Sequence, residues 1–353
     1  MNILVIGKFY TEGFGLHIAE NLETMGHTVS RFEPGYRSDR IGGLVGHRID
    51  QAGRVLRGIS DNLPAMRSWH LRKLWDLIEN LSLDLVIVIH DFLWPSEVAE
   101  LKRRSEAPVV LWFPDALVNF GRGFFMNAPY DGLFFKDPFI VDRLKNFLDI
   151  PVYYLPECFN PMKHSAANID ESELASYRCD ITCAGNQHSW RVAIFKQLSE
   201  YNVKLWGPPQ PLWLDIAPVT KMHQGRPVHN REKTSAFRAA KIVVNNLHYG
   251  EIWGVNVRTF EIAGIGGFQM VDWRPGIEPL FKIGKELICF RSISDLKQKI
   301  DYWLPRDDER QEIALAGMQR AHAEHTYSQR LSLLLDTLVG KESGYPLPLG
   351  RDA

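Results

Sequence analysis

A glycine-bearing loop that runs into a helix start is the stretch of this chain best suited to binding a ligand. The loop, Gly250–Gly254, precedes a helix that the pattern predicts to begin near Val255–Val257. The unpaired amides of a helix start, with the positive end of its dipole, bind anions. Asn256 and Arg258 add side-chain donors there, and Glu261 is placed one turn later to accept from two adjacent hydroxyls, such as those of a ribose. This pattern predicts a site for a phosphorylated nucleoside.

A plainer interpretation of the same helix stays open. Arg258 and Glu261 stand at i and i+3, so they can form a surface ion pair worth about 0.2–0.5 kcal/mol. Spacing alone does not separate the two interpretations. Gly264, Gly266 and Gly267 follow, and they allow the backbone to turn closely into the next strand.

Two other loops place polar groups at the ends of predicted strands. Gly185 and Asn186 follow one strand and precede Arg191, whose guanidinium can hold two phosphate oxygens at once. Asn245 and His248 follow another strand and are expected to border the same ligand. The alternative for Arg191 is a first-turn arginine with its head group in water.

Three residues in the first half are candidates for acid–base work. His90, Asp91 and Asp115 each follow a predicted strand, where a histidine or carboxylate can orient a hydroxyl or assist removal of its proton. Such side chains equally often cap the next helix. The loop Gly7–Gly15 allows close approach of a ligand to the backbone, but it is not GxGxxG and is a weak signal.

Short apolar runs that end at polar or glycine residues predict the elements that hold these groups. Runs of three to five residues, apolar on both faces, are typical of strands in a parallel sheet covered on both sides. Segments with helical spacing lie between them. The predicted strands are Ile3–Ile6, Leu85–Ile89, Val109–Phe113, Leu133–Phe135 and Val152–Leu155, then Ile181–Ala184, Val203–Trp206, Ile242–Val244, Phe268–Val271 and Leu287–Phe290.

Two successive βα arrays predict two Rossmann-like, doubly wound α/β domains that face an interdomain cleft. Ligands bind beyond the carboxyl ends of such strands, where the polar residues above stand. The expected limits are a first domain over 1–156, a linker over 157–175 and a second domain over 176–325. A helix over 326–340 is expected to pack back on the first domain, and 341–353 form a tail.

Bulk composition excludes several classes of protein. The 353 residues carry a net charge of −1 and are 45% hydrophobic, unlike disordered, collagenous or nucleic-acid-gripping chains. The four scattered cysteines are expected to be buried thiols, since no partner pair follows Cys179 and Cys183 at zinc-site spacing. The first residues predict a strand rather than a signal peptide, and no apolar stretch reaches about 18 residues. A cytoplasmic protein is expected.

Residues 31–75 form a basic stretch with apolar residues interleaved. Nine Arg or Lys stand against four Asp or Glu, a local net charge of +5. A basic amphipathic face can lie on anionic lipid at the inner face of a membrane, or hold an acidic acceptor. A solvated helical face explains the pattern equally well.

The stretch Asn256-Val-Arg-Thr-Phe-Glu261-Ile-Ala-Gly-Ile-Gly266-Gly-Phe resembles the donor-site signature of the CgeB-like (spore maturation protein type) glycosyltransferases. These are retaining enzymes of GT-B fold. The similarity continues through Pro275–Glu286, Asp308–Arg310 and His325-Thr-Tyr-Ser-Gln-Arg330. In the first half, Val110-Leu-Trp-Phe-Pro-Asp115, Tyr130-Asp131 and Tyr154-Leu-Pro-Glu157 fall where the family has comparable segments.

The resemblance implies roles for individual residues. Glu261 matches the family's glutamate on the donor ribose, and Asn256 and Arg258 match positions at the donor diphosphate. Gly185-Asn186 and Arg191 resemble the loop where a basic residue approaches that diphosphate. The wider retaining group often has an earlier glutamate with seven residues between, whereas Glu251 has nine between it and Glu261, so a role for Glu251 is left open.

The resulting prediction is a glycosyltransferase that moves a sugar from a nucleoside-diphosphate sugar, with retention implied by the resemblance. No cofactor is expected beyond this co-substrate, and no metal, because no DxD stands between apolar runs. The acceptor is open among glycan, lipid-linked, protein and small-molecule classes, and no nucleic-acid partner is expected. Two alternatives remain: a sugar-nucleotide epimerase or hydrolase on the same scaffold, and a catalytically silent nucleotide- or sugar-binding module.

Overall fold

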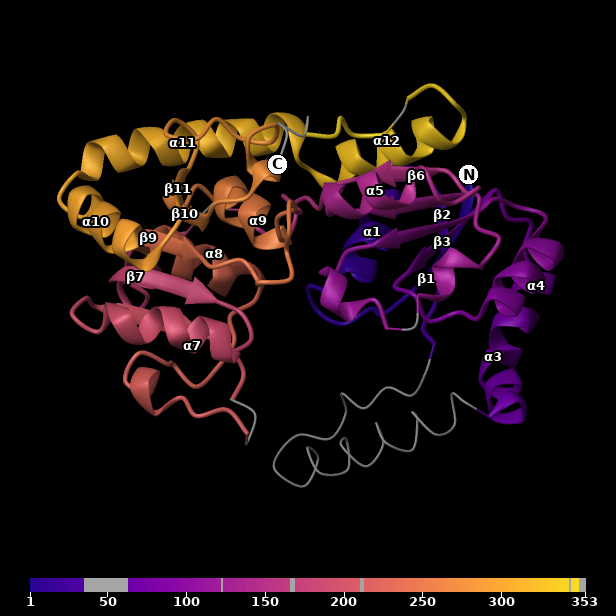
Figure 1. Ribbon diagram of the computed structural model, residues 1–353, viewed down its shortest axis with the longest axis horizontal. Coiled ribbons are helices and arrows are strands. Elements are labelled where there is room, and N and C mark those ends of the chain that lie inside the picture. The colour runs from indigo at the N-terminus through magenta and orange to yellow at the C-terminus, as the bar shows by residue number, and fades with distance from the viewer. Residues whose placement is uncertain (35–62, 122, 166–168, 210–212, 343, 349–353) are drawn as a thin grey trace. The chain divides into compact units, whose positions relative to one another are not determined.

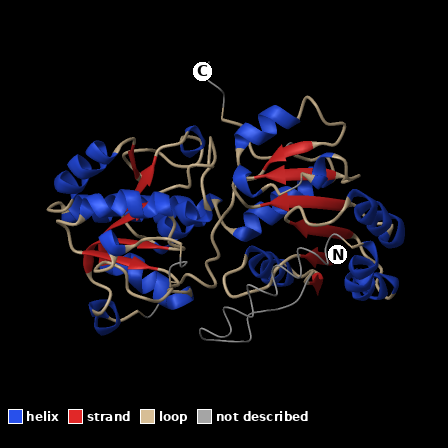
Figure 2. Ribbon diagram, turned by 60° about the horizontal axis from the view of Figure 1, so that its bottom comes forward, coloured by secondary structure: helices blue, strands red, loops and turns tan. Residues whose placement is uncertain are grey.

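The computed structural model describes residues 1–34, 63–121, 123–165, 169–209, 213–342 and 344–348. The described chain folds into two parallel sheets whose strands alternate with helices (Figure 1). Figure 2 shows each sheet as a stack of strands flanked by helices. The α/β fold class predicted from the apolar runs is therefore confirmed.

The first sheet has six strands in the order β2-β1-β3-β4-β5-β6. Strand β1 pairs in parallel with β2 and with β3, where Ile3 lies opposite Leu85. The strands are β1 (Asn2–Ile6), β2 (Thr28–Phe32), β3 (Leu85–Ile89), β4 (Val109–Phe113), β5 (Gly132–Phe135) and β6 (Val152–Tyr154).

The second sheet has five strands in the order β11-β10-β9-β7-β8. Strand β9 lies in the middle and pairs in parallel with β7 and β10, and β7 pairs in parallel with the edge strand β8. The strands are β7 (Cys179–Ala184), β8 (Val203–Trp206), β9 (Ala240–Asn245), β10 (Gln269–Asp272) and β11 (Ile288–Phe290).

Helices connect the strands, as parallel pairing requires. In the first array they are α1 (Phe14–Thr24), α3 (Pro64–Glu79), α4 (Pro95–Ser105) and α5 (Pro138–Leu144). In the second array, α7 (Ser189–Phe195), α8 (Asn230–Ala239) and α9 (Val257–Ile265) lie between strands. Helix α6 (Glu171–Ala175) precedes β7, and α10 (Ile293–Trp303), α11 (Asp307–Glu324) and α12 (Tyr327–Leu338) follow the last strand.

The apolar runs form strands because both faces of each sheet are covered. Every residue of β3 and β4 is buried, which explains why these strands lack the alternation of a half-exposed strand. All ten predicted strands are present; three match their predicted bounds, and the ends of the others are shifted by at most two residues. The prediction missed β2, because this edge strand alternates polar with apolar residues and is only partly buried.

The chain divides into two compact units, Met1–Phe113 with Arg122–Leu133, and Pro114–Gly121 with Phe134–Ala353. The division falls within β5, so it follows a different line from the predicted limits at 156 and 176, which stay a prediction. In the second unit, α12 donates from Arg330 Nε to the carbonyl of Pro156 over 3.1 Å.

Most of the basic stretch, residues 35–62, lies outside the described residues, so the lipid-binding hypothesis gains no structural account. Within the described ranges, no helix combines the length and the apolar character needed to cross a bilayer. All four cysteines are buried free thiols, as expected.

Candidate functional site

Two arginines of the second unit converge on one glycine at the carboxyl end of β7. Gly185 has φ +135°, and a Cβ built on it would lie 3.0 Å from Nη1 of Arg191 and 3.5 Å from Nη2 of Arg258. Only glycine adopts this backbone conformation readily. The guanidinium groups of α7 and α9 are thus brought to one point on the backbone, although 67 residues separate them in sequence.

Arg191 is a buried cation without a buried acid beside it. Its side chain donates from Nε to Oδ1 of Asn246 over 3.0 Å and from Nη1 to the carbonyl of Asn186 over 2.6 Å. No carboxylate pairs with it in the described parts of the chain. Burial, and then the nearby charge of Arg258, lower the pKa of Arg191. A buried guanidinium with only neutral partners is suited to receive an anion.

The start of α9 is fixed by amides. Oδ1 of Asn256 caps the helix by accepting from the backbone N–H of Thr259 over 3.2 Å. Nδ2 of Asn245 lies 3.1 Å from Oδ1 of Asn256, 3.0 Å from Oγ1 of Thr259 and 3.2 Å from Oε1 of Gln269. Asn245 and Asn256 therefore orient the helix start, including the backbone of Val255 and Val257, through contacts within the protein.

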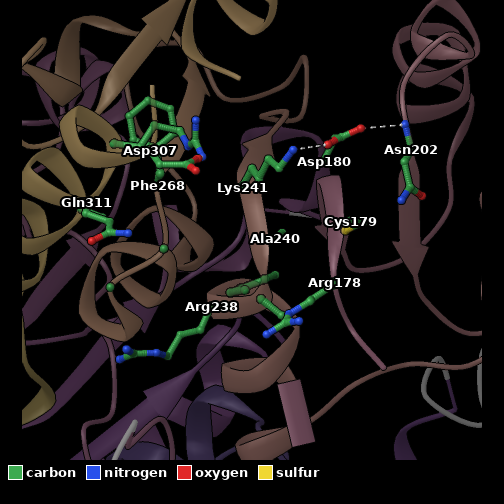
Figure 3. Close-up of a pocket in the computed structure, with 16 residues that line it drawn as sticks. Arg178, Cys179, Asp180, Asn202, Arg238, Ala240, Lys241, Phe268, Asp307 and Gln311 are labelled. Atoms are coloured by element: carbon green, nitrogen blue, oxygen red, sulfur yellow. Dashed lines mark hydrogen bonds and ion pairs between the residues drawn. The ribbon is translucent and has the colours of Figure 1, made fainter. Parts of the chain in front are cut away.

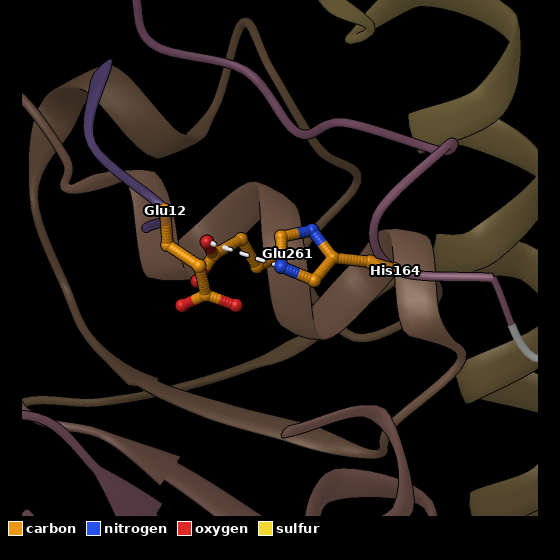
Figure 4. Close-up of side chains that lie close together, drawn as sticks. All are labelled: Glu12, His164 and Glu261. Carbon is orange, nitrogen blue, oxygen red and sulfur yellow. Dashed lines mark ion pairs between the residues drawn. The ribbon is translucent and has the colours of Figure 1, made fainter. Parts of the chain in front are cut away.

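Glu261 is held by cations from two helices. Its Oε1 lies 3.0 Å from Nζ of Lys233 on α8, and its Oε2 accepts from Nη1 of Arg258 over 2.6 Å. Nε2 of His164 lies 3.8 Å from Oε1, and Figure 4 shows this imidazole directed at the carboxylate. The i, i+3 pair of Arg258 and Glu261 does form, but Glu261 is buried, unlike the carboxylate of a surface ion pair.

The loop before α9 is tied to the end of β5 by a buried ion pair. Nζ of Lys136 lies 2.7 Å from Oε1 of Glu251 and 3.3 Å from Oε2 of Glu157. Burial, opposed by the charge of Lys136, raises the pKa of Glu157 to about 7. Oε2 of Glu251 is buried and has no hydrogen-bond partner among the described residues.

Asp137 also joins the loop before α9 to the residues after β5. Its carboxylate accepts from the backbone N–H groups of Ile252 and Trp253, at 2.9 and 3.2 Å, and also from Phe139 at the start of α5. A Cβ on Gly254 would lie 2.9 Å from the Asp137 backbone, so this loop packs directly on the end of β5.

His248 lies in a cluster of rings. Its ring centroid is 4.1 Å from Tyr249 and 5.6 Å from His188, and its Nδ1 accepts from the N–H of Gly250. Burial and the charge of Arg191 lower the pKa of His188 to about 4, so its ring is neutral and caps α7.

Gly266 is not brought to this cluster. It is the C-cap of α9 in left-handed conformation, with φ +83°, and it lies at the opposite end of the helix from Asn256. Nine helical residues separate the two ends, a span of about 13 Å.

The three acid–base candidates have structural contacts of their own. In the first unit, Asp91 accepts from the N–H groups of Phe124 and Phe125, at 2.7 and 2.9 Å, and burial raises its pKa. His90 has φ +69°, and its ring contacts Phe113 edge-on. In the second unit, the charge of Asp115 contributes to raising the pKa of Glu157. Asp91 thus accepts from the 3-10 turn at Phe124–Met126 rather than from the start of the next helix, α4, and the catalytic assignments stay a prediction.

The sequence prediction missed four side chains of this region: Lys136, Gln187, Lys233 and Asn246. Both amide atoms of Gln187 and Nδ2 of Asn246 are buried without a partner in the described chain. Gln187 follows Gly185 and Asn186, and Asn246 follows Asn245, so their place after predicted strands was the only available signal. Lys136 likewise follows a predicted strand, whereas nothing local marks Lys233.

Comparison with known proteins agrees with this architecture. Residues 188–336 match the family model described as glycosyl transferase-like, which is less than half of the chain. No curated protein matches the chain.

Three solved structures illustrate the likeness in fold. A glycosyltransferase from Rickettsia africae is 13% identical, with TM-score 0.66, covering 96% of this chain and 98% of that one. Sucrose-phosphate synthase from Thermosynechococcus elongatus is 10% identical, with TM-score 0.64 and coverage of 97% and 100%. Anabaena Alr3699/HepE, in complex with UDP and glucose, is 12% identical, with TM-score 0.62 and coverage of 96% and 100%. The fold is that of the GT-B glycosyltransferases.

Proposed function

We propose that this chain is a glycosyltransferase whose second unit binds a nucleoside-diphosphate sugar between α7 and the start of α9. The observation that carries the proposal is the convergence of Arg191 and Arg258 on Gly185. Two like charges attract an anion that bridges them, and a diphosphate has oxygens enough for both. The family match over 188–336 covers all these residues except Gly185 and supports the same assignment.

The proposed chemistry is stabilisation of the leaving diphosphate. As the bond from the sugar to the diphosphate breaks, negative charge grows on the phosphate oxygens. Arg191, Arg258 and the first amides of α9 are fixed donors at that position, and preorganised donors stabilise developing charge without reorganising. Asn245 and Asn256 serve this step by holding the helix start.

Glu261 is proposed to accept from the donor ribose, as the family resemblance implies. Its carboxylate already binds Lys233 and Arg258. Arg258 would therefore link the ribose-binding carboxylate to the diphosphate, and the loss of either charge would disturb the other.

Metal independence, retention and the CgeB-like subtype are parts of the same proposal. Two arginines and a helix start can supply the charge compensation that a cation provides elsewhere. Retention and the subtype rest on the motif from Asn256 to Gly266. The proposal also includes a cytoplasmic location and an acceptor of glycan, lipid-linked, protein or small-molecule class.

A thermal-shift panel tests the donor site first. UDP, GDP, ADP, CDP and dTDP are added with and without magnesium to the parent, to Arg191→Ala and to Arg72→Ala. Arg72 is an exposed arginine of α3, so the last variant controls for loss of charge. We expect one base to raise Tm by a few degrees without magnesium, because a ligand at a hundred times its Kd stabilises by about 2.7 kcal/mol.

The shift should vanish in Arg191→Ala and persist in Arg72→Ala. No shift with any nucleotide, or an equal shift in all three proteins, would reject the site. Turnover is then measured with the matching nucleotide sugar: acceptor-dependent consumption supports transfer, and full-rate consumption without acceptor indicates an epimerase or hydrolase instead.

A further inference from the structure

Two histidines of the second unit lie next to each other at the edge of the sheet where β7 and β9 end. His188 stands in the loop after β7, and His248 follows β9. Their ring centroids are 5.6 Å apart and both side chains are half-buried, so one phosphate-sized group can contact both rings. The cavity in Figure 3 lies at the other edge, where the same two strands begin, and does not include this pair.

Both rings carry their proton on Nε2. Nδ1 of His188 accepts from the backbone N–H of Arg191 over 3.3 Å, and Nδ1 of His248 accepts from the N–H of Gly250 over 3.0 Å. A ring whose Nδ1 accepts is neutral and has its proton on Nε2. Burial, and then the charge of Arg191, lower the pKa of His188 to about 4, which keeps this ring neutral. The rings therefore present two N–H donors, and neither Nε2 has a hydrogen-bond partner within the described residues.

The contacts made by Nδ1 do not require histidine. Asparagine and aspartate are preferred at helix N-caps, and they readily accept from a backbone N–H two residues further on. These are the positions of His188, which is the N-cap of α7, and of His248, which stands two residues before Gly250. The imidazole differs from those shorter side chains by the donor on its far side. Histidine at both positions therefore points to a use for Nε2.

A series of contacts orders the histidines relative to the proposed donor. Glu261, which is proposed to bind the ribose, accepts from Arg258 over 2.6 Å. Arg258 and Arg191 meet at one glycine, and the charge of Arg191 reaches His188. His188 in turn contacts His248. A donor with its ribose at Glu261 and its diphosphate on the arginines therefore has its sugar-bearing phosphate towards the histidines.

We propose that His188 and His248 donate from Nε2 to the sugar-bearing phosphate of the nucleotide donor. The assignment rests on the proposed function and adds two contacts to it. When the bond between the sugar and this phosphate breaks, its electron pair stays on the phosphate oxygen and the imidazoles keep their protons. Two fixed donors stabilise the charge that grows there. Because the rings are neutral, they add these donors without placing a third positive charge beside Arg191.

Replacement by asparagine or glutamine separates this role from the local one. His188→Asn and His248→Asn keep an acceptor near the position of Nδ1 and lose the donor at Nε2, whereas His188→Gln and His248→Gln place an amide N–H near the position of Nε2. UDP, GDP, ADP, CDP, dTDP and the five matching monophosphates are titrated calorimetrically into the full chain and each variant. The measured quantity is the ratio of the monophosphate Kd to the diphosphate Kd for the base that binds.

The ratio should fall about tenfold in each asparagine variant, because a hydrogen bond to a charged group is lost. The Tm without ligand should stay at the parent value, because the local acceptor remains. The glutamine variants should keep the ratio within about threefold of the parent. His223→Asn is the matched control, since Nδ1 of His223 accepts from the N–H of Gly225 over 3.1 Å in the loop before α8. It should leave the ratio unchanged.

An unchanged ratio in either asparagine variant would overturn the pair. Equal losses for the monophosphate and the diphosphate would overturn it too, because the histidines would then act through the fold or the nucleoside. If Arg191→Ala abolishes diphosphate binding while the histidine variants keep the parent ratio, the donor site stands and only the histidine contact fails. If no diphosphate binds the parent, both proposals are rejected.

Discussion

Nζ of Lys136 lies 2.7 Å from Oε1 of Glu251, although the two residues are 115 positions apart in sequence. Both side chains are buried, and Glu157 adds a second carboxylate to the same ammonium. Lys136 follows β5, and Glu251 belongs to the loop that leads to α9. This pair therefore connects two segments of the second unit: the residues after β5 and the loop that precedes the proposed diphosphate site.

Removing the cation from this cluster should destabilise the protein. Lys136→Met leaves two buried carboxylates without their partner, and breaking a buried pair in this way typically costs about 3–5 kcal/mol. Urea unfolding measures the loss. Lys241→Met is the control, because Lys241 pairs with Asp180 on an exposed part of the surface and should cost about 1 kcal/mol or less. Equal losses in the two variants would contradict the importance of the buried cluster.

The raised pKa of Glu157 makes stability depend on pH. Between its ordinary pKa near 4.5 and its folded value of about 7, the folded state binds more protons than the unfolded state. Stability from this group therefore falls as pH rises through that window, by at most about 1.4 kcal/mol per unit. Glu157→Gln removes the titrating carboxyl group. The free energy of unfolding of the parent should therefore fall relative to that of the variant from pH 5 to 7.

The parent is compared with Glu157→Gln because two histidines change the free energy of unfolding with pH in the opposite direction. Burial lowers the pKa of His188 to about 4 and that of His325 to about 3. Their neutral forms are favoured in the folded state, so their contribution is lost as pH falls below about 6.5. Urea unfolding of both proteins at several pH values isolates Glu157, and a difference that is flat with pH would contradict the assignment.

Gly185→Ala should impair nucleotide binding more than it impairs folding. The new methyl group would stand 3.0 Å from Nη1 of Arg191 and push the two guanidinium groups from their positions. The left-handed backbone adds a strain of about 1–3 kcal/mol. Gly284→Ala is the matched control, since Gly284 also has positive φ but nothing within 4 Å of a new Cβ. Affinity for the preferred nucleoside diphosphate should fall at least tenfold in the first variant alone; a similar fall in both would trace the effect to strain.

Gln187→Leu separates a ligand contact from a structural one. Both amide atoms of Gln187 are buried and have no partner among the described residues, so an apolar side chain of similar size should keep or raise the stability of the free protein. Donor affinity should fall about fivefold or more if the ligand satisfies the amide. A variant with lower stability and unchanged affinity would show that Gln187 supports the fold instead.

Most of the fold and part of the candidate site could be predicted from local sequence patterns. Strands such as β3 and β4 were predictable because both faces are buried and leave an unbroken apolar run. The edge strand β2 was not, because its burial is partial and its pattern mixed. Arg191 and Arg258 could be predicted from helix starts, but their meeting at Gly185 is a product of sheet order, which no local pattern contains.

The side chains that pair with the site residues were harder to predict from the sequence. Lys233 reaches Glu261 from a neighbouring helix, and Lys136 reaches Glu251 across 115 residues. Asn245 and Asn256 were predicted to face the ligand because of their position at a strand end and a helix start. The structure shows that their amides bond to each other. Oδ1 of Asn256 also accepts from the backbone N–H of Thr259, one of the groups at a helix start that need an acceptor.

The amide network that joins the end of β9, the start of α9 and the start of β10 also defines a unit of recombination. Four side chains of this segment hydrogen-bond to one another: Asn245, Asn256, Thr259 and Gln269. Residues 245–269 therefore hold the strand end and the helix start in place through contacts within the segment. A chimera that exchanges this whole segment with a relative keeps these four side chains paired with one another. A crossover inside the segment would separate the strand from its helix cap, so exchange of donor preference between such proteins should succeed with the complete cassette and fail with either half.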